Sequence, residues 1–80
     1  MANWMHADVS GGNLLIVNLF APDAELQACT DIITEEAQKA GAQVVAEGRN
    51  QLCLSGLPKR LLRAIAKKAE KRIHDLQETE

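Results

Sequence analysis

The fold of this chain is decided by residues 43–58, which read QVVAEGRNQLCLSGLP. Residues 43–47 and 51–55 have the length and composition of strands, and the Gly-Arg-Asn between them is typical of a turn. The two strands are therefore predicted to pair as a hairpin. Gly56 and Pro58 then end the second strand and begin a helix, because Gly adopts positive φ easily and Pro is favoured in the first helical turn.

Downstream of the hairpin, a helix is predicted from Leu57 to about Glu78. At 100° per residue its apolar side chains gather into one buried arc: Leu61, Leu62, Ile65, Ala69, Ile73 and Leu76. Arg72 falls inside this arc, and we expect its stem to lie at the edge of the core while its guanidinium reaches water. Residues 77–80 are expected to fray.

Upstream of the hairpin, Pro22 and Gly41 mark the ends of another predicted helix. Residues 13–20 begin with aliphatic side chains on both faces, which indicates a central strand. Residues 3–9 alternate and indicate an edge strand paired with it. The predicted order is (β)β-α-β-β-α. We therefore expect one α+β domain over residues 1–80, a two-layer sandwich with three or four strands and both helices on one face of the sheet.

The composition is that of a globular domain, with 46% hydrophobic and 25% charged residues. The longest wholly apolar run, residues 14–17, is far shorter than the ~20 residues that span a bilayer. The N-terminus also lacks the pattern of a signal peptide. We expect a cytoplasmic protein that makes no membrane contact. A homodimer remains open, because so small a core often gains stability by association.

Charge is distributed unevenly along the chain. Residues 1–58 contain seven acids and two bases, whereas residues 59–72 contain seven bases and one acid. Four of these bases recur at spacings of three and four, which puts them on the outer side of the last helix: Arg60, Arg63, Lys67 and Lys71. At 1.5 Å per residue they span about 16 Å.

Three interpretations of these bases are open. They could pair with the acidic first helix, since opposite charges on neighbouring helices pack favourably. They could instead bind an acidic protein partner or nucleic acid, together with Arg72. The net charge of −2 and the pI near 5.6 argue against nucleic acid. So does the scarcity of stacking aromatics, since Trp4 and Phe20 are the only ones.

No group of residues in the sequence indicates catalysis, a metal or a cofactor. Cys29 and Cys53 are expected to be reduced and buried, with a disulfide between them as the alternative. His6 and His74 lie near opposite ends of the chain and are interpreted as surface residues. Trp4 is interpreted either as packing at the rim of the sheet or as contacting a partner subunit, because Trp is enriched at interfaces.

Residues 44–56, VVAEGRNQLCLSG, followed by a long helix, resemble the second half of the DinI-like family of modulators of the RecA recombinase. Hairpin length, the Asn at the turn, the Leu in the next strand and the closing Gly are shared. The resemblance implies a compact sheet with two helices on one face, and binding to a protein filament. The last helix is acidic in that family and basic here, so no functional residue is carried over.

These observations predict a small non-enzymatic regulatory or adaptor module that binds a protein partner with an acidic surface. A nucleic-acid-binding accessory protein using the same helix is the first alternative. The second is a ligand-binding or enzymatic subunit whose site forms only at an oligomer interface.

Overall fold

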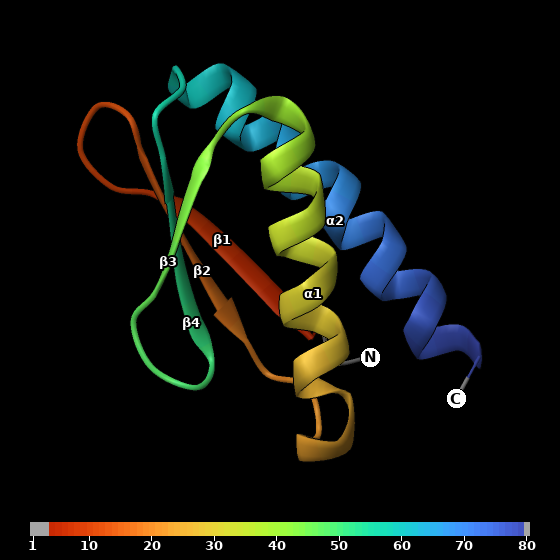
Figure 1. The fold of residues 1–80 in the computed structure, drawn as a ribbon. Helices are drawn as coiled ribbons and strands as arrows, with labels where there is room; N and C mark the ends of the chain where they lie inside the picture. Colours follow the sequence, from red (N-terminus) through yellow and green to blue (C-terminus); the bar gives the residue numbers. More distant parts are fainter. Residues whose placement is uncertain (1–3, 80) are drawn as a thin grey trace.

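The computed structural model describes residues 4–79 and contains four strands and two helices (Figure 1). In chain order these are β1 (Met5–Val9), β2 (Leu14–Leu19), α1 (Asp23–Ala40), β3 (Gln43–Ala46), β4 (Gln51–Ser55) and α2 (Lys59–Thr79). The predicted α+β class and element order are confirmed. The segment before β2 does form a fourth strand.

All four strands belong to one antiparallel sheet with the order β1-β2-β4-β3. The central position of β2 and the edge position of β1 are confirmed. Because β4 pairs with β2, the hairpin of β3 and β4 packs beside the hairpin of β1 and β2. The other edge strand is therefore β3.

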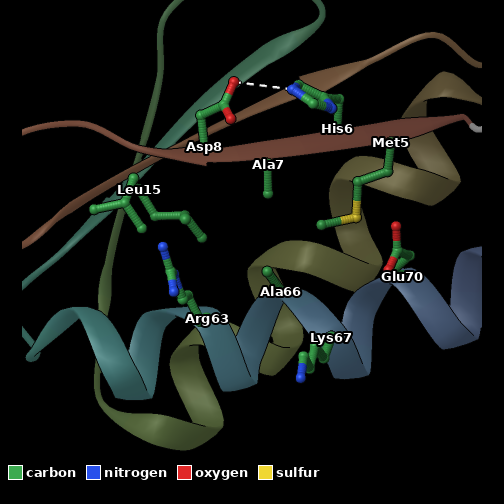
Figure 2. Close-up of a pocket in the computed structure, with 10 residues that line it drawn as sticks. Met5, His6, Ala7, Asp8, Leu15, Arg63, Ala66, Lys67 and Glu70 are labelled. Atoms are coloured by element: carbon green, nitrogen blue, oxygen red, sulfur yellow. Dashed lines mark hydrogen bonds and ion pairs between the residues drawn. The ribbon is translucent and has the colours of Figure 1, made fainter.

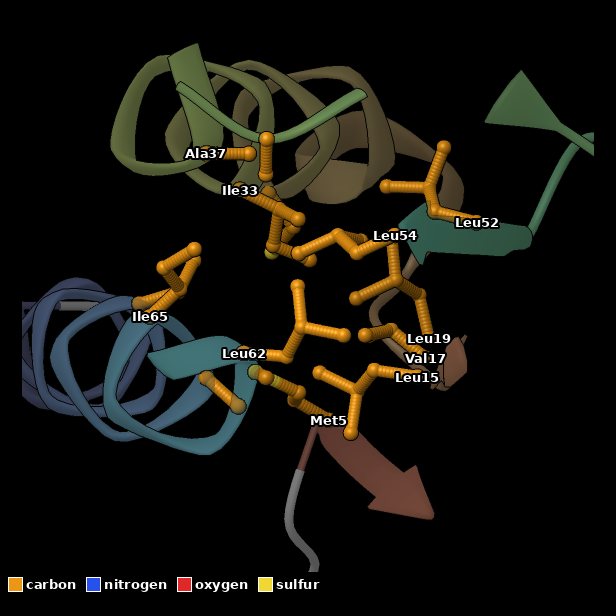
Figure 3. Packing of buried hydrophobic residues seen from close by; sticks show 14 of the residues in the cluster. Met5, Leu15, Val17, Leu19, Ile33, Ala37, Leu52, Leu54, Leu62 and Ile65 are labelled. Atoms are coloured by element: carbon orange, nitrogen blue, oxygen red, sulfur yellow. The ribbon is translucent and has the colours of Figure 1, made fainter. Parts of the chain in front are cut away.

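Both helices cover the same face of the sheet (Figure 1), as the alternation of the strands predicts. Along β2, Leu15, Val17 and Leu19 are buried, while the residues between them are only half-buried. Leu52 and Leu54 continue this buried face on β4. Opposite them lie apolar side chains of the helices, including Ile33 and Leu62 (Figure 3). The core is a single aliphatic layer between sheet and helices.

The ends of α1 follow from its flanking residues. Pro22 precedes the helix and accepts a hydrogen bond from the amide of Glu25 at 2.8 Å. Gly41 has φ of 86°, a left-handed conformation that Gly adopts without steric cost. The amide of Ala42 then donates to the carbonyl of Ala37 at 2.9 Å, which closes the last turn. The predicted end at Gly41 is confirmed.

Some boundaries differ from the predicted ones. The strand predicted over residues 3–9 begins at Met5, and residue 3 lies outside the described part of the chain. The last helix begins at Lys59 because Pro58 accepts the first hydrogen bonds, from Leu61 and Leu62. It runs through residues 77–79, for which the sequence predicts fraying, and residue 80 lies outside the described range.

The predicted buried arc of α2 is wrong at one position. Leu61 is 40% exposed, whereas Leu62, its neighbour, is fully buried. The helix faces both the sheet and α1, and its buried surface is centred on Leu62, Ala69 and Ile73. A rotation of 100° from Leu62 carries Leu61 to the margin of that surface.

This difference predicts unequal effects of the same substitution at adjacent positions. We expect Leu62→Ala to lower the free energy of unfolding by about 2–5 kcal/mol, because it leaves a cavity in the core. Leu61→Ala should lower it by less than about 1 kcal/mol, since little apolar area is lost from the core. Urea unfolding followed by circular dichroism measures both values, and equal losses would contradict the assigned rotation of α2.

Candidate protein-binding surface

The four bases Arg60, Arg63, Lys67 and Lys71 are all exposed on α2; together they are called the basic surface below. The helix turns them away from its buried side, which is occupied by Leu62, Ala69 and Ile73 in the core layer. Among the residues that the structure describes, none of the four forms an ion pair with a carboxylate. Their charge is therefore presented to solvent.

Arg72 is placed differently from these four bases. Its guanidinium donates hydrogen bonds to Glu35 at 2.8 Å and to Glu36 at 2.7 Å, both on α1. The carboxylate of Glu36 is almost fully covered, with 8% of the residue exposed. The Arg72 side chain is 40% exposed, so its guanidinium reaches water as predicted, but its pairing with two specific carboxylates of α1 was not predicted. Arg72 lies inside the buried arc because it closes the junction between the two helices.

The junction also involves Lys39, whose ammonium lies 3.6 Å from Glu35 and 3.7 Å from Glu36. The pairing of the acidic helix with the basic helix that the sequence suggested therefore exists. In the described part of the chain it engages Arg72 from α2, but not the basic surface. Internal pairing accounts for only one of the five bases considered as candidate binding residues.

The hydrogen bond from Arg72 holds the pKa of Glu36 below its ordinary value. Burial of the carboxyl acts in the opposite direction, and the charges of Lys39, Arg72 and Lys68 add to the lowering. A carboxylate with a lowered pKa stabilises the folded state above the unfolded pKa, which is near 4.3. This contribution is lost as the pH falls through the lower pKa of the folded state.

A groove of about 340 Å³ lies between edge strand β1 and α2 (Figure 2). Its apolar lining comes from both elements and from β2: Met5, Ala7, Val9, Leu15 and Ala66. Arg63 extends from α2 toward Leu15, at one end, and Glu70 lies beneath Met5, at the other (Figure 2). Lys67 also borders the groove, with its side chain directed away from the sheet. The basic surface is thus continuous with an apolar groove.

This groove was not predicted from the sequence. The alternation of residues 3–9 places Met5, Ala7 and Val9 on one face of the strand, where only Met5 is fully buried and the other two are half-buried. The one indication of a groove in the sequence was that residues 5–9 belong to a predicted edge strand. An edge strand is flanked on one side only, so its inward side chains stay partly open unless a helix covers them completely.

Trp4 is half-buried and packs against the core. Its carbonyl accepts a hydrogen bond of 2.7 Å from the amide of Phe20, which extends the pairing of β1 with β2. Of the two roles considered for Trp4, packing at the rim of the sheet agrees with this position. Phe20 itself is 61% exposed and lies at the far end of β2 from the turn.

The other residues considered as site candidates are not brought together. His6 pairs with Asp8 at 2.9 Å and His74 pairs with Glu78 at 2.9 Å, each within its own element. Both cysteines are free thiols. Cys29 is fully buried, as predicted, but Cys53 is only half-buried. Burial raises the pKa of each thiol, with a further contribution from Glu25 for Cys29 and from Glu47 for Cys53.

Within the described residues, no three His, Cys, Asp or Glu side chains are grouped so that they could hold a metal ion. Over the same range, neither helix is both long and apolar enough to cross a membrane. Comparison of the chain with known protein families, with curated proteins and with solved structures found no match. The resemblance to the DinI-like family therefore stays a prediction.

The helix junction has a testable pH dependence. We expect Glu36→Gln to be less stable than the wild type at pH 7, because it loses the charge that Arg72 binds. The difference should shrink as the pH falls below the unfolded pKa of about 4.3 and through the lower pKa of the folded state, where Glu36 itself becomes protonated. Asp75→Asn, which removes the same charge from an exposed position of α2, serves as the control. Urea unfolding between pH 7 and pH 3 measures this, and a difference independent of pH would contradict the assignment.

Proposed function

We propose that this chain is a small non-enzymatic adaptor or regulatory module that binds an acidic surface of another protein in the cytoplasm. The observation that carries the proposal is the basic surface on α2. Its four bases are exposed, and within the described residues no carboxylate neutralises them.

The spacing of these bases makes the surface costly for the fold itself. Arg63, Lys67 and Lys71 follow one another at intervals of four residues, which places like charges side by side on the helix. Each such pair destabilises a helix by about 0.2–0.5 kcal/mol. Glu70 and Asp75 follow Lys67 and Lys71 by three and four residues, but neither forms an ion pair that offsets this repulsion in the described structure. An acidic partner would offset it, which supports a role outside the folded chain.

Nucleic acid is the second candidate for the same surface, because bases spread over about 16 Å could follow several phosphates. The rest of the chain argues against it. Glu35 and Glu36 lie beside α2, and the chain as a whole carries a net charge of −2. Of the two aromatics that could stack on bases, Trp4 is packed against the core.

The proposal predicts that the basic surface is needed for binding but not for folding. Arg63→Gln with Lys67→Gln lowers the net charge by two on the basic surface. The matched control, Gln38→Glu with Gln43→Glu, lowers it equally at exposed positions of α1 and β3. We expect proteins captured from native cell extract by the immobilised wild type to be retained by the control and lost by the first variant. Circular dichroism should show that all three are folded.

Capture of the same proteins by the folded Arg63→Gln, Lys67→Gln variant would refute a role for this surface. A titration with labelled single-stranded and duplex oligonucleotides, at about 50 and 200 mM salt, separates the two candidates. We expect no binding at either concentration. An affinity for nucleic acid that falls steeply with salt would assign the surface to phosphates instead.

A further inference from the structure

In β1, every second residue directs its backbone N–H and C=O groups away from β2, toward the open edge of the sheet. The amide of Phe20 donates to Trp4, and the amide of Ser10 donates to Leu14 at 2.8 Å. In an antiparallel pair, bonded residues alternate with unbonded ones. His6 and Asp8 therefore bond to β2, which pairs them with Asn18 and Ile16. The remaining residues of β1, which are Met5, Ala7 and Val9, direct their N–H and C=O groups outward.

No strand lies beyond β1 in the described part of the chain. The outward backbone groups of Ala7 therefore border the groove between β1 and α2. The side chain of Ala7 points toward α2 (Figure 2), and both Ala7 and Val9, which line the groove, are only half-buried. A fifth strand beside β1 would pair with the outward groups, and its inward side chains would fill the groove. This is the geometry of recognition by strand addition.

We propose that β1 takes up an extended, acidic segment of the partner protein as a fifth strand. The charged side chains at the two ends of the groove determine which residues this segment must carry and where they lie. Arg63 lies at the Leu15 end of the groove, so an acidic side chain is required there (Figure 2). Glu70 lies beneath Met5 at the other end, where the segment must carry a neutral or basic residue. Side chains of alternate residues point into the groove, because alternate residues of a strand share one face.

A second copy of this chain is the other molecule that could pair with β1. Two copies joined edge to edge at β1 would bring two α2 helices together, since α2 covers β1 (Figure 1). Each α2 carries the basic surface, so like charges would meet beside the new interface. An acidic segment neutralises the same charges. We therefore commit to the acidic segment, which rests on the proposed function because both need a partner that brings carboxylates to α2.

The test uses a probe that can be made without knowing the partner. A library of random 12-residue peptides is selected on the immobilised wild-type protein, and the enriched peptides are labelled for anisotropy titration. We expect enriched peptides with alternating apolar side chains and an acidic residue near one end. Amide hydrogen exchange should slow at Ala7 and Val9 when such a peptide binds, since their outward N–H groups become hydrogen-bonded.

Two substitutions separate strand addition from simple charge attraction. Ala7→Pro removes an outward N–H and is tolerated on an edge strand, because this N–H does not bond to β2. Ala46→Pro is the matched control at the opposite edge, where the bond of Glu47 to Gln51 shows that the amide of Ala46 also points outward. We expect Ala7→Pro to weaken peptide binding by about tenfold or more, and Ala46→Pro to leave it unchanged.

Arg63→Glu, which leaves the backbone intact, should also weaken binding about tenfold or more. Peptides that bind Ala7→Pro as tightly as the wild type but lose affinity for Arg63→Glu would overturn strand addition and leave the proposed function standing. Peptides unaffected by either substitution would overturn both. Failure to enrich any peptide would also refute an open edge at β1. Light scattering gives a further test. A wild-type dimer that becomes monomeric in Ala7→Pro would assign the edge of β1 to a second copy of the chain and refute the proposal.

Discussion

One aliphatic layer between the sheet and the helices holds every element of this fold in place. The chain has a single Trp, a single Phe and no Tyr, so the layer is filled mainly by Leu, Ile, Val and Ala side chains, joined by Met5 and Cys29. Each strand contributes only its inward residues, because side chains alternate across a strand. A chain of this size cannot fill a second layer on the other face. The outer face of the sheet is consequently left open, with Val45 53% exposed beside Cys53.

The same layer divides the charges of α2 into two groups. Residues on the α1 side of the helix meet the acids of that helix, and Arg72 is bound there by Glu35 and Glu36. Residues on the other side face β1, β2 and solvent, and there the bases form no ion pair with a carboxylate among the described residues. One side of α2 therefore stabilises the fold by packing against α1, and the other side presents positive charge that no carboxylate balances in the described structure. Its position relative to β1 is what joins that charge to an apolar groove.

The strands, the helices and their order were predictable because each depends on local patterns. The alternation of residues 5–9, the Gly at position 41 and the Pro at position 58 act within a few residues of themselves. The partner of Arg72 was not predictable. Glu36 lies 36 residues away, and its contact depends on how two helices cross, which no short pattern encodes. The exposure of Leu61 was missed for a related reason, since a helical wheel gives the apolar arc but not where its margin falls.

The groove could not be predicted from the sequence, because it depends on how α2 lies over the sheet. The alternation of the sequence places Met5, Ala7 and Val9 on one face of β1, but the partial exposure of Ala7 and Val9 follows from the position of α2 over the edge of the sheet. Charge spacing along α2 was visible in the sequence, whereas the absence of internal partners for Arg60 and its neighbours in the described structure was not. The basic surface could therefore be located from the sequence, but its separation from the helix junction could not.

The position of Trp4 has an optical consequence. It is the only Trp in a chain without Tyr, so excitation at the long-wavelength edge of protein absorption addresses one indole, just before β1. That indole is half-buried against the core and sits next to Met5, at one end of the groove. Its emission wavelength depends on how much water surrounds it. The unlabelled protein thus carries a built-in fluorophore that reports on the edge of its own sheet.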